Sequence, residues 1–96
     1  MPHYIQLVKW TEQGIRNVKD SPKRADDFAK MVQQVGGKTQ VFYTLGEYDI
    51  VAVTEVPSDE AILQVNLAVS KLGNVRTTTL KAWTSEEISK VISKLS

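Results

Sequence analysis

The sequence of 96 residues suits a single small domain, whose thin core would gain from association with another chain. A formal net charge of +1 argues against the basic surface that nucleic acids or anionic membranes require, and the absence of cysteine excludes disulfides, thiol nucleophiles and thiolate metal sites. No secretion signal or membrane-length apolar run is recognisable. We therefore expect one cytoplasmic domain over residues 1–96, with no membrane or nucleic-acid partner.

The first predicted elements are a strand, a loop and a helix. Residues 4–10 are rich in β-forming side chains and predict a strand. The polar residues 11–20 predict a loop with a short helical turn. Ser21-Pro22 resembles an N-cap followed by proline at the first helical position, and Gly36-Gly37 is typical of a helix end. One face of this helix carries apolar residues at helical spacing: Ala25, Phe28, Ala29, Val32 and Val35.

A hairpin and a second helix follow. Residues 38–45 and 48–55 predict two strands, and Gly46-Glu47 between them suits a two-residue type II′ turn. Pro57-Ser58 predicts the end of the second strand and the start of the helix, which Gly73-Asn74 terminates. The apolar positions of this helix are Ala61, Ile62, Val65, Ala68, Val69 and Leu72.

The last elements are a threonine-rich strand over residues 75–83 and a C-terminal helix. Thr84 and Glu87 have the spacing of a capping box. The helix carries one apolar stripe: Ile88, Val91, Ile92 and Leu95. The order βαββαβ plus a final helix predicts an α+β, ferredoxin-like fold with an antiparallel four-stranded sheet, strand order 4-1-3-2, and both main helices on one face.

The predicted turn sets the hairpin register, and the register decides which side chains share a face of the sheet. We expect these residues under the helices: Ile5, Leu7, Val41, Tyr43, Leu45, Tyr48, Ile50 and Ala52. We expect these on the other face: Tyr4, Gln6, Val8, Trp10, Gln40, Phe42, Thr44, Asp49, Val51, Val53 and Glu55. The second face is too apolar to stay bare, so a second copy, or alternatively the C-terminal helix, should cover it. A cavity between two paired sheets would then be the place for a small ligand.

Three blocks of this sequence resemble the GYD domain family: TEQGIRNVKDSPKR, TLGEYDIVAVTEVPSDE and LGNVRTTTLKAW. The Gly, Tyr and Asp of the family name stand here as Gly46, Tyr48 and Asp49, with Glu47 between the first two. The family is similar to the dimeric α/β barrels, in which ferredoxin-like domains pair face to face. The resemblance therefore implies a homodimer or a higher homo-oligomer. It does not imply one activity, because that superfamily includes small monooxygenases, haem-handling enzymes and ligand-sensing modules.

The candidate ligand-binding residues are Trp10, Arg16, Arg24, Thr44, Tyr48 and Asp49. Asp49 is either a cavity carboxylate, usable as a base if desolvation raises its pKa, or the structural ion-pair partner of Arg16. Arg16 and Arg24 lie near a helix N-terminus and either bind an anion or hold a solvated loop. We interpret Trp10 as a wall of the cavity or interface, and Tyr48 as a tyrosine buried under the helices.

No residue pattern indicates a cofactor. His3 is the only histidine, and we interpret it as a surface residue and expect no metal site. Two main functions stay open. The first is a homo-oligomeric binding or assembly module with a small-ligand cavity between sheets. The alternative is a cofactor-free monooxygenase-type enzyme in which Asp49 or Tyr48 positions the substrate. A third interpretation has a dry interface, an Asp49–Arg16 pair and a purely structural assembly.

Overall fold

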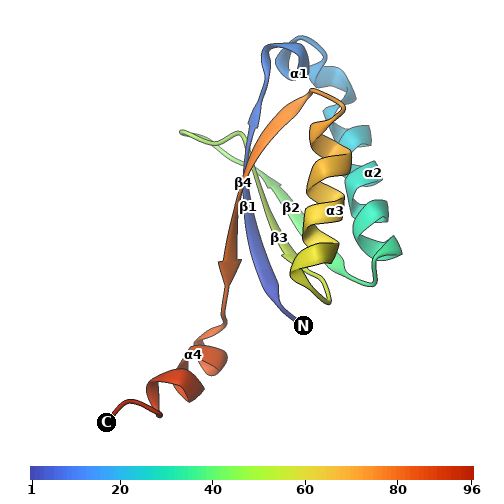
Figure 1. Ribbon diagram of the computed structural model, residues 1–96. Coiled ribbons are helices and arrows are strands. Elements are labelled where there is room, and N and C mark those ends of the chain that lie inside the picture. Colours follow the sequence, from blue (N-terminus) through green and yellow to red (C-terminus); the bar gives the residue numbers. More distant parts are fainter.

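A computed structural model describes residues 1–96 (Figure 1). The strands are β1 (His3–Trp10), β2 (Lys38–Tyr43), β3 (Ile50–Glu55) and β4 (Val75–Ala82). The helices are α1 (Glu12–Arg16), a 3-10 turn η1 (Val18–Asp20), α2 (Ser21–Gln34), α3 (Asp59–Ser70) and α4 (Ser85–Ile92). The antiparallel sheet has the order β2-β3-β1-β4, which is the predicted order 4-1-3-2 read from the other edge. Helices α2 and α3 cover one face of the sheet (Figure 1), and we call the other one the open face.

The hairpin register is as predicted, but the turn is longer. Tyr43 pairs with Ile50 and Val41 pairs with Ala52. The regular strands stop there, and residues 44–49 form the connection instead of a two-residue turn. The Thr44 N–H donates to the Asp49 carbonyl at 2.9 Å, and Gly46 adopts a φ of 110°, a conformation that glycine tolerates best.

The face prediction for strand β1 was wrong. Gln6 pairs with Ala52 on one side and with Thr79 on the other, so the even-numbered residues of β1 lie under the helices. Tyr4, Gln6 and Val8 are buried there. Ile5 and Leu7 lie on the open face. Both faces of this strand are apolar, so hydrophobicity alone favoured turning the polar Gln6 outward.

A chain of hydrogen bonds under the helices explains why Gln6 can be buried. The Thr54 hydroxyl donates to Gln6 Oε1 at 2.8 Å, and Gln6 Nε2 donates to Asn66 Oδ1 at 2.6 Å. Asn66 Nδ2 then donates to Thr79 Oγ1 at 2.9 Å. At the other end, Thr39 and Thr54 share a hydroxyl contact of 2.7 Å. This series of hydrogen bonds links residues of all four strands through α3. It satisfies polar groups whose burial without partners would be costly.

The apolar core is small and lies between the sheet and the two long helices. Its buried members are Tyr4, Val32, Val56, Ile62 and Val65. The predicted apolar faces of α2 and α3 point into this layer, with Phe28, Met31, Val35, Ala61 and Val69 packed around it. Only 11 of the 96 residues are buried, which confirms that the core is thin.

The helix starts agree with the sequence prediction at α3 and α4 but not at α2. Ser58 caps α3 by accepting the Ala61 N–H, and Thr84 with Glu87 forms the predicted capping box of α4. Ser21 is not an N-cap. It is the first residue of α2, and its buried hydroxyl lies 2.9 Å from the Tyr43 hydroxyl. The tertiary contact therefore replaces the expected local one.

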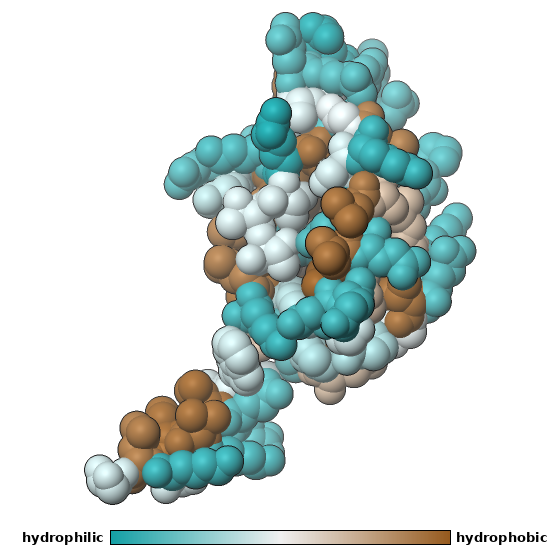
Figure 2. All heavy atoms as spheres, viewed as in Figure 1, coloured by the Kyte–Doolittle hydropathy of each residue, from teal (hydrophilic) through white to brown (hydrophobic).

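Helix α4 does not cover its own sheet, contrary to the second alternative for the open face. It extends away from the domain beyond the end of β4 (Figure 1), and none of its residues is buried. Its apolar side chains form a visible patch on the extension (Figure 2). Whatever covers the open face is therefore not the α4 of the same chain.

Helix α3 is joined to β1 and β4 by a short polar cluster at its N-terminus. The Tyr4 hydroxyl donates to Asp59, and Lys81 Nζ lies 2.9 Å from the same carboxylate. Burial, the hydrogen bond to Asp59 and nearby negative charges raise the pKa of Tyr4 from 10.0 to about 12. The hydrogen bonds from Tyr4 and Lys81 lower the pKa of Asp59.

This cluster predicts a specific alkaline destabilisation. Since the folded-state pKa of Tyr4 is raised, its contribution to stability is present below pH 10 and is lost as the pH rises through about 12. Tyr4→Phe should remove this loss. We expect the free energy of unfolding, measured by urea denaturation, to fall less steeply between pH 10 and 12 in Tyr4→Phe than in the wild type. Tyr48→Phe, whose hydroxyl has no bond to Asp59, should keep the wild-type slope, and equal slopes in all three proteins would contradict the assignment.

Candidate functional site

A cavity of about 130 Å³ lies between the helix-covered face of the sheet and helices α2 and α3. All four strands contribute residues to its floor, and Leu72 and Asn74 of the α3–β4 connection line one end. The lining residues are Gln6, Val8, Trp10, Ser21, Arg24, Ala25, Asp27, Phe28, Met31, Val41, Ile50, Ala52, Asn66, Val69, Leu72, Asn74, Val75 and Thr77. The cavity is formed by one chain. It lies on the helix-covered side of the sheet. The predicted inter-sheet cavity would lie on the open face and needs a second chain, so it stays a prediction.

The amides of Gln6 and Asn66 give this mainly apolar cavity a polar wall. The Gln6 amide oxygen accepts a hydrogen bond from Thr54, and the Asn66 amide oxygen accepts one from Gln6. Each amide nitrogen carries two hydrogens and uses one of them in this series of hydrogen bonds. The polar wall therefore offers N–H donors, which suits a ligand oxygen.

Trp10 forms the cavity wall at the end of β1. Its indole Nε1 is buried and has no hydrogen-bond partner. Its ring lies 6.3 Å from the Tyr43 ring, centroid to centroid, at a tilt of 38°. Buried indole N–H groups usually find an acceptor, so this free donor is a second feature that suits an oxygen-bearing ligand.

The structure separates Arg16 and Arg24, which were predicted either to bind an anion or to hold a solvated loop. Arg24 lines the cavity, but its guanidinium donates to the carbonyls of Asn17 at 3.0 Å and Gly14 at 3.3 Å. Arg16 is outside the cavity and forms an exposed ion pair with Glu12 at 3.0 Å. Arg24 thus holds the segment before α2 in place, and the two side chains do not form a joint anion site.

Asp49 bonds to the backbone of β1, so the predicted pair with Arg16 was wrong. The Trp10 N–H donates to Asp49 Oδ2 at 2.9 Å, and the Asp49 N–H donates to the Val8 carbonyl at 2.9 Å. Regular pairing of β1 with β3 ends at Val8 and Ile50. The Asp49 carboxylate therefore extends the hydrogen-bond ladder by one position and fixes the backbone that carries the Trp10 ring.

Thr44 and Tyr48 belong to the hairpin connection and not to the cavity. The Thr44 hydroxyl donates to the Tyr48 carbonyl at 2.6 Å. The Tyr48 ring lies 5.2 Å from Lys9 Nζ, and Lys9 is on the open face. The prediction that Tyr48 and Leu45 lie under the helices was therefore wrong. The alternation of faces applies only to regular strand, and the strands end before these residues.

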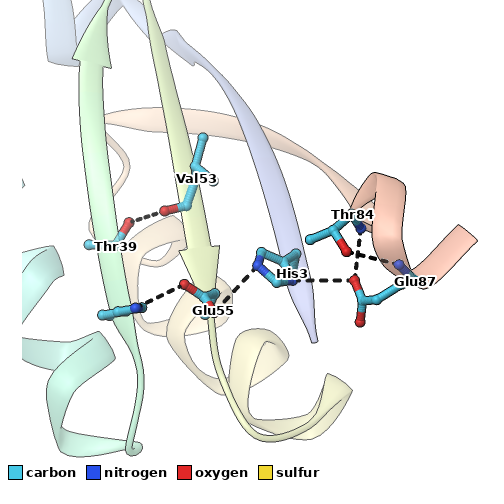
Figure 3. A network of polar contacts seen from close by, with 7 residues as sticks. His3, Thr39, Val53, Glu55, Thr84 and Glu87 are labelled. Atoms are coloured by element: carbon cyan, nitrogen blue, oxygen red, sulfur yellow. Dashed lines mark hydrogen bonds and ion pairs between the residues drawn. The ribbon is translucent and has the colours of Figure 1, made fainter. Parts of the chain in front are cut away.

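A separate polar cluster surrounds His3 where β1, β3 and α4 meet (Figure 3). His3 Nε2 lies 3.3 Å from Glu55 and Nδ1 lies 3.8 Å from Glu87, while Lys38 Nζ lies 3.4 Å from Glu55. The pKa of Glu87 is lowered, mainly by the hydrogen bond from the Thr84 backbone N–H. No group of three or more His, Cys, Asp or Glu side chains is arranged to hold a metal ion. This cluster joins α4 to the domain.

Of the six predicted site residues, the structure places Trp10 and Arg24 at the cavity and the other four outside it. Gln6 and Asn66 line the cavity but were not among the six predicted site residues. Asn66 carried a usable signal, because it interrupts the apolar face of α3 between Val65 and Val69. Gln6 similarly stands among apolar residues in a strand. Two amides in apolar surroundings indicate a buried polar pair, since each would otherwise be unsatisfied.

The βαββαβ order, the antiparallel sheet and two helices over one face define a ferredoxin-like domain. The GYD domain family matches residues 4–92, and the chain belongs to this family. No curated protein matches the sequence. No helix of the chain has the length and apolar character needed to cross a membrane.

Two solved structures have a similar fold. The crystal structure of TTHA0845 from Thermus thermophilus is 21% identical with a TM-score of 0.58, covering 88% of this chain and 96% of that chain. The structure of At3g17210 from Arabidopsis thaliana is 10% identical with a TM-score of 0.57, over the same shares of the two chains. At these identities the likeness establishes the fold alone.

The hydrogen bond from the Trp10 N–H to Asp49 predicts that an Asp49 variant that keeps an oxygen acceptor is more stable than one that lacks it. Asp49→Ala removes the partner of the Trp10 N–H, and a hydrogen bond to a charged group contributes about 1.5–3 kcal/mol. We expect the free energy of unfolding to fall by about this amount. Asp49→Asn keeps an oxygen acceptor and should lose clearly less. Urea denaturation measures both, and equal losses in the two variants would contradict the ladder role.

Proposed function

We propose that this GYD-domain protein is a small-molecule-binding module, with its ligand in the cavity between the sheet and helices α2 and α3, and that two copies associate through their open faces. The observation that carries the binding function is the combination of an apolar cavity with unused N–H donors on Gln6, Asn66 and Trp10. Apolar walls with a few polar groups that fix orientation are typical of ligand sites.

The size and chemistry of the cavity limit the ligand. A water molecule needs about 10–15 Å³ of such space, so 130 Å³ accommodates several waters or a small organic molecule. The free groups on the polar wall are donors. The ligand is therefore a small, largely apolar molecule that bears an oxygen acceptor, such as a phenol, ketone or carboxylate.

A binding function fits the lining better than the alternative, a cofactor-free monooxygenase-type enzyme. Proton abstraction needs a base aimed at the substrate. The ionisable lining residues are Arg24 and Asp27. Arg24 is held by backbone carbonyls, and Asp27 pairs with Lys23 at 3.2 Å. Neither Asp49 nor Tyr48, the residues predicted to position a substrate, lines this cavity.

The open face supports self-association. Phe42, Val53 and Leu80 are large apolar residues on this face, with exposed fractions of 45%, 39% and 46%. Ile5 and Leu7 lie between them on the central strand β1. Monomeric proteins seldom leave such a continuous apolar patch in water. A second copy presents the same patch, so two sheets packed face to face cover both.

Filling the cavity should abolish binding. In a Trp83→Phe background Trp10 is the only tryptophan, and its emission reports on the cavity. We expect 4-nitrophenol, a small aromatic with an oxygen acceptor, to quench this emission saturably. Ala25→Phe, which places a ring in the cavity, should weaken binding about tenfold or more. Ala29→Phe, on the same helix but outside the cavity lining, is the matched control. Equal binding by both variants, or no saturable binding of phenols, ketones or carboxylates by the parent, would contradict the site.

Charge on the open face should prevent self-association. Val53→Arg places a charge where a second sheet would bury it, and an uncompensated buried charge costs about 3–5 kcal/mol. We expect sedimentation equilibrium to give a dimer mass for the wild type and a monomer mass for Val53→Arg. Gln64→Arg, on the exposed surface of α3, should remain dimeric. A monomeric wild type, or a dimeric Val53→Arg, would overturn the face-to-face arrangement.

A further inference from the structure

Helix α4 is a short helix with no buried residue, and its apolar side is not covered by its own chain. Its apolar stripe consists of Ile88, Val91 and Ile92, with Leu95 beyond the end of the helix, and these four side chains are 41% to 73% exposed. The helix lies on the side of the sheet opposite α2 and α3, beyond the end of β4 (Figure 1), and the stripe forms a continuous apolar surface there (Figure 2). The capping box and the contact of Glu87 with His3 hold the start of this helix in place (Figure 3).

A helix of this length needs a packing partner. It has 8 residues, and isolated helices shorter than about 12–15 residues are marginal in water. Its capping box helps to start the helix, but most helical stability in proteins comes from packing an apolar face. The stripe supplies such a face, and its own chain supplies no surface to cover it.

The dimensions of the chain indicate how large the missing contact is. A folded monomer of this mass is expected to expose about 5,500 Å², whereas this chain exposes 6587 Å². Its radius of gyration is 14.7 Å, against about 12.5 Å for a compact chain of this length. The excess surface is about 1,000 Å², close to the roughly 800 Å² that each partner buries in a standard interface. A second protein molecule is therefore an occupant of the right size.

We propose that α4 is an arm that packs on a second copy of this chain, with its apolar stripe against the tip of the partner's β2–β3 hairpin. Like α4, this hairpin projects on the open side of the sheet, and the two lie at opposite ends of it (Figure 1). Leu45 at the tip is fully exposed. A two-fold axis perpendicular to the strands places the α4 of each copy against the β2–β3 hairpin tip of the other copy. The two contacts are therefore equivalent. This inference rests on the face-to-face dimer of the proposed function.

The charges fit a second copy better than a lipid surface. The C-terminal turn after α4 carries Lys94, and the hairpin tip carries Glu47, a residue of opposite charge that lies 3.7 Å from Lys9 of its own chain. The arm itself has two acidic residues, Glu86 and Glu87, and two basic ones, Lys90 and Lys94. Helices that bind membrane surfaces are usually rich in basic residues on the polar face, and this one is electrically balanced.

Disulfide trapping tests the contact directly, because the chain has no cysteine of its own. We expect the double variant Leu45→Cys/Val91→Cys to form reducible covalent dimers under mild oxidation. The matched control Leu45→Cys/Lys90→Cys places the second thiol on the opposite side of α4 and should form far fewer. Equal cross-linking in the two variants, or disulfides only within one chain, would overturn the proposal.

Association strength gives a second, independent test. Val91→Lys/Ile92→Lys should weaken dimerisation about tenfold or more, since two aliphatic side chains lose their burial. Ser89→Lys/Ser93→Lys adds the same charge away from the stripe and should match the wild type. Hydrogen exchange should show α4 amides protected in the wild type and exchanging freely in Val53→Arg.

The results of these experiments distinguish the proposed α4 contact from the proposed face-to-face dimer. A dimeric wild type with unchanged affinity in both lysine variants would overturn the arm and leave the face-to-face dimer standing. A monomeric wild type would overturn both. Sedimentation of the wild type with anionic phosphatidylserine vesicles, lost in Val91→Lys/Ile92→Lys, would assign the stripe to a lipid surface instead.

Discussion

The buried amide of Gln6 is the constraint on which the other features depend. Left without partners under the helices, it would cost about 1–3 kcal/mol, and Thr54 and Asn66 satisfy it on both sides. Turning Gln6 inward turns every even-numbered residue of the central strand inward as well. The odd-numbered apolar residues of that strand then face outward. The polar wall of the cavity and the apolar open face are therefore two results of one choice of strand face.

This arrangement gives the two sides of the sheet different roles. The helix-covered side encloses an apolar space with N–H donors on its wall, which suits a small ligand. The open side carries exposed apolar residues and lies between two projections, the β2–β3 hairpin and α4 (Figure 1), which suits another protein surface. Since β1 and β3 contribute residues to both sides, the proposed ligand site and the proposed dimer interface share the same central strands.

Asp49, which we assigned to the Gly, Tyr and Asp of the family name, holds the backbone of β1 through a hydrogen bond. Its carboxylate replaces a main-chain carbonyl at the position where β3 has already ended, and it binds the Trp10 N–H at 2.9 Å. Gly46 and Tyr48 lie before it in the connection between β2 and β3. The signature thus forms a hairpin end that fixes the strand carrying Trp10, a wall residue of the cavity.

The element order, the strand order, the apolar faces of α2 and α3, the hairpin register and the capping box of α4 could be predicted from the sequence, because each depends on a local pattern or on a steric rule for connections. The inward face of β1, the backbone partner of Asp49 and the place of the cavity could not, because they depend on contacts between distant parts of the chain. The first strand is apolar on both faces, so its periodicity was uninformative. Its orientation depends on pairing Gln6 with Asn66, a residue 60 positions away along the chain.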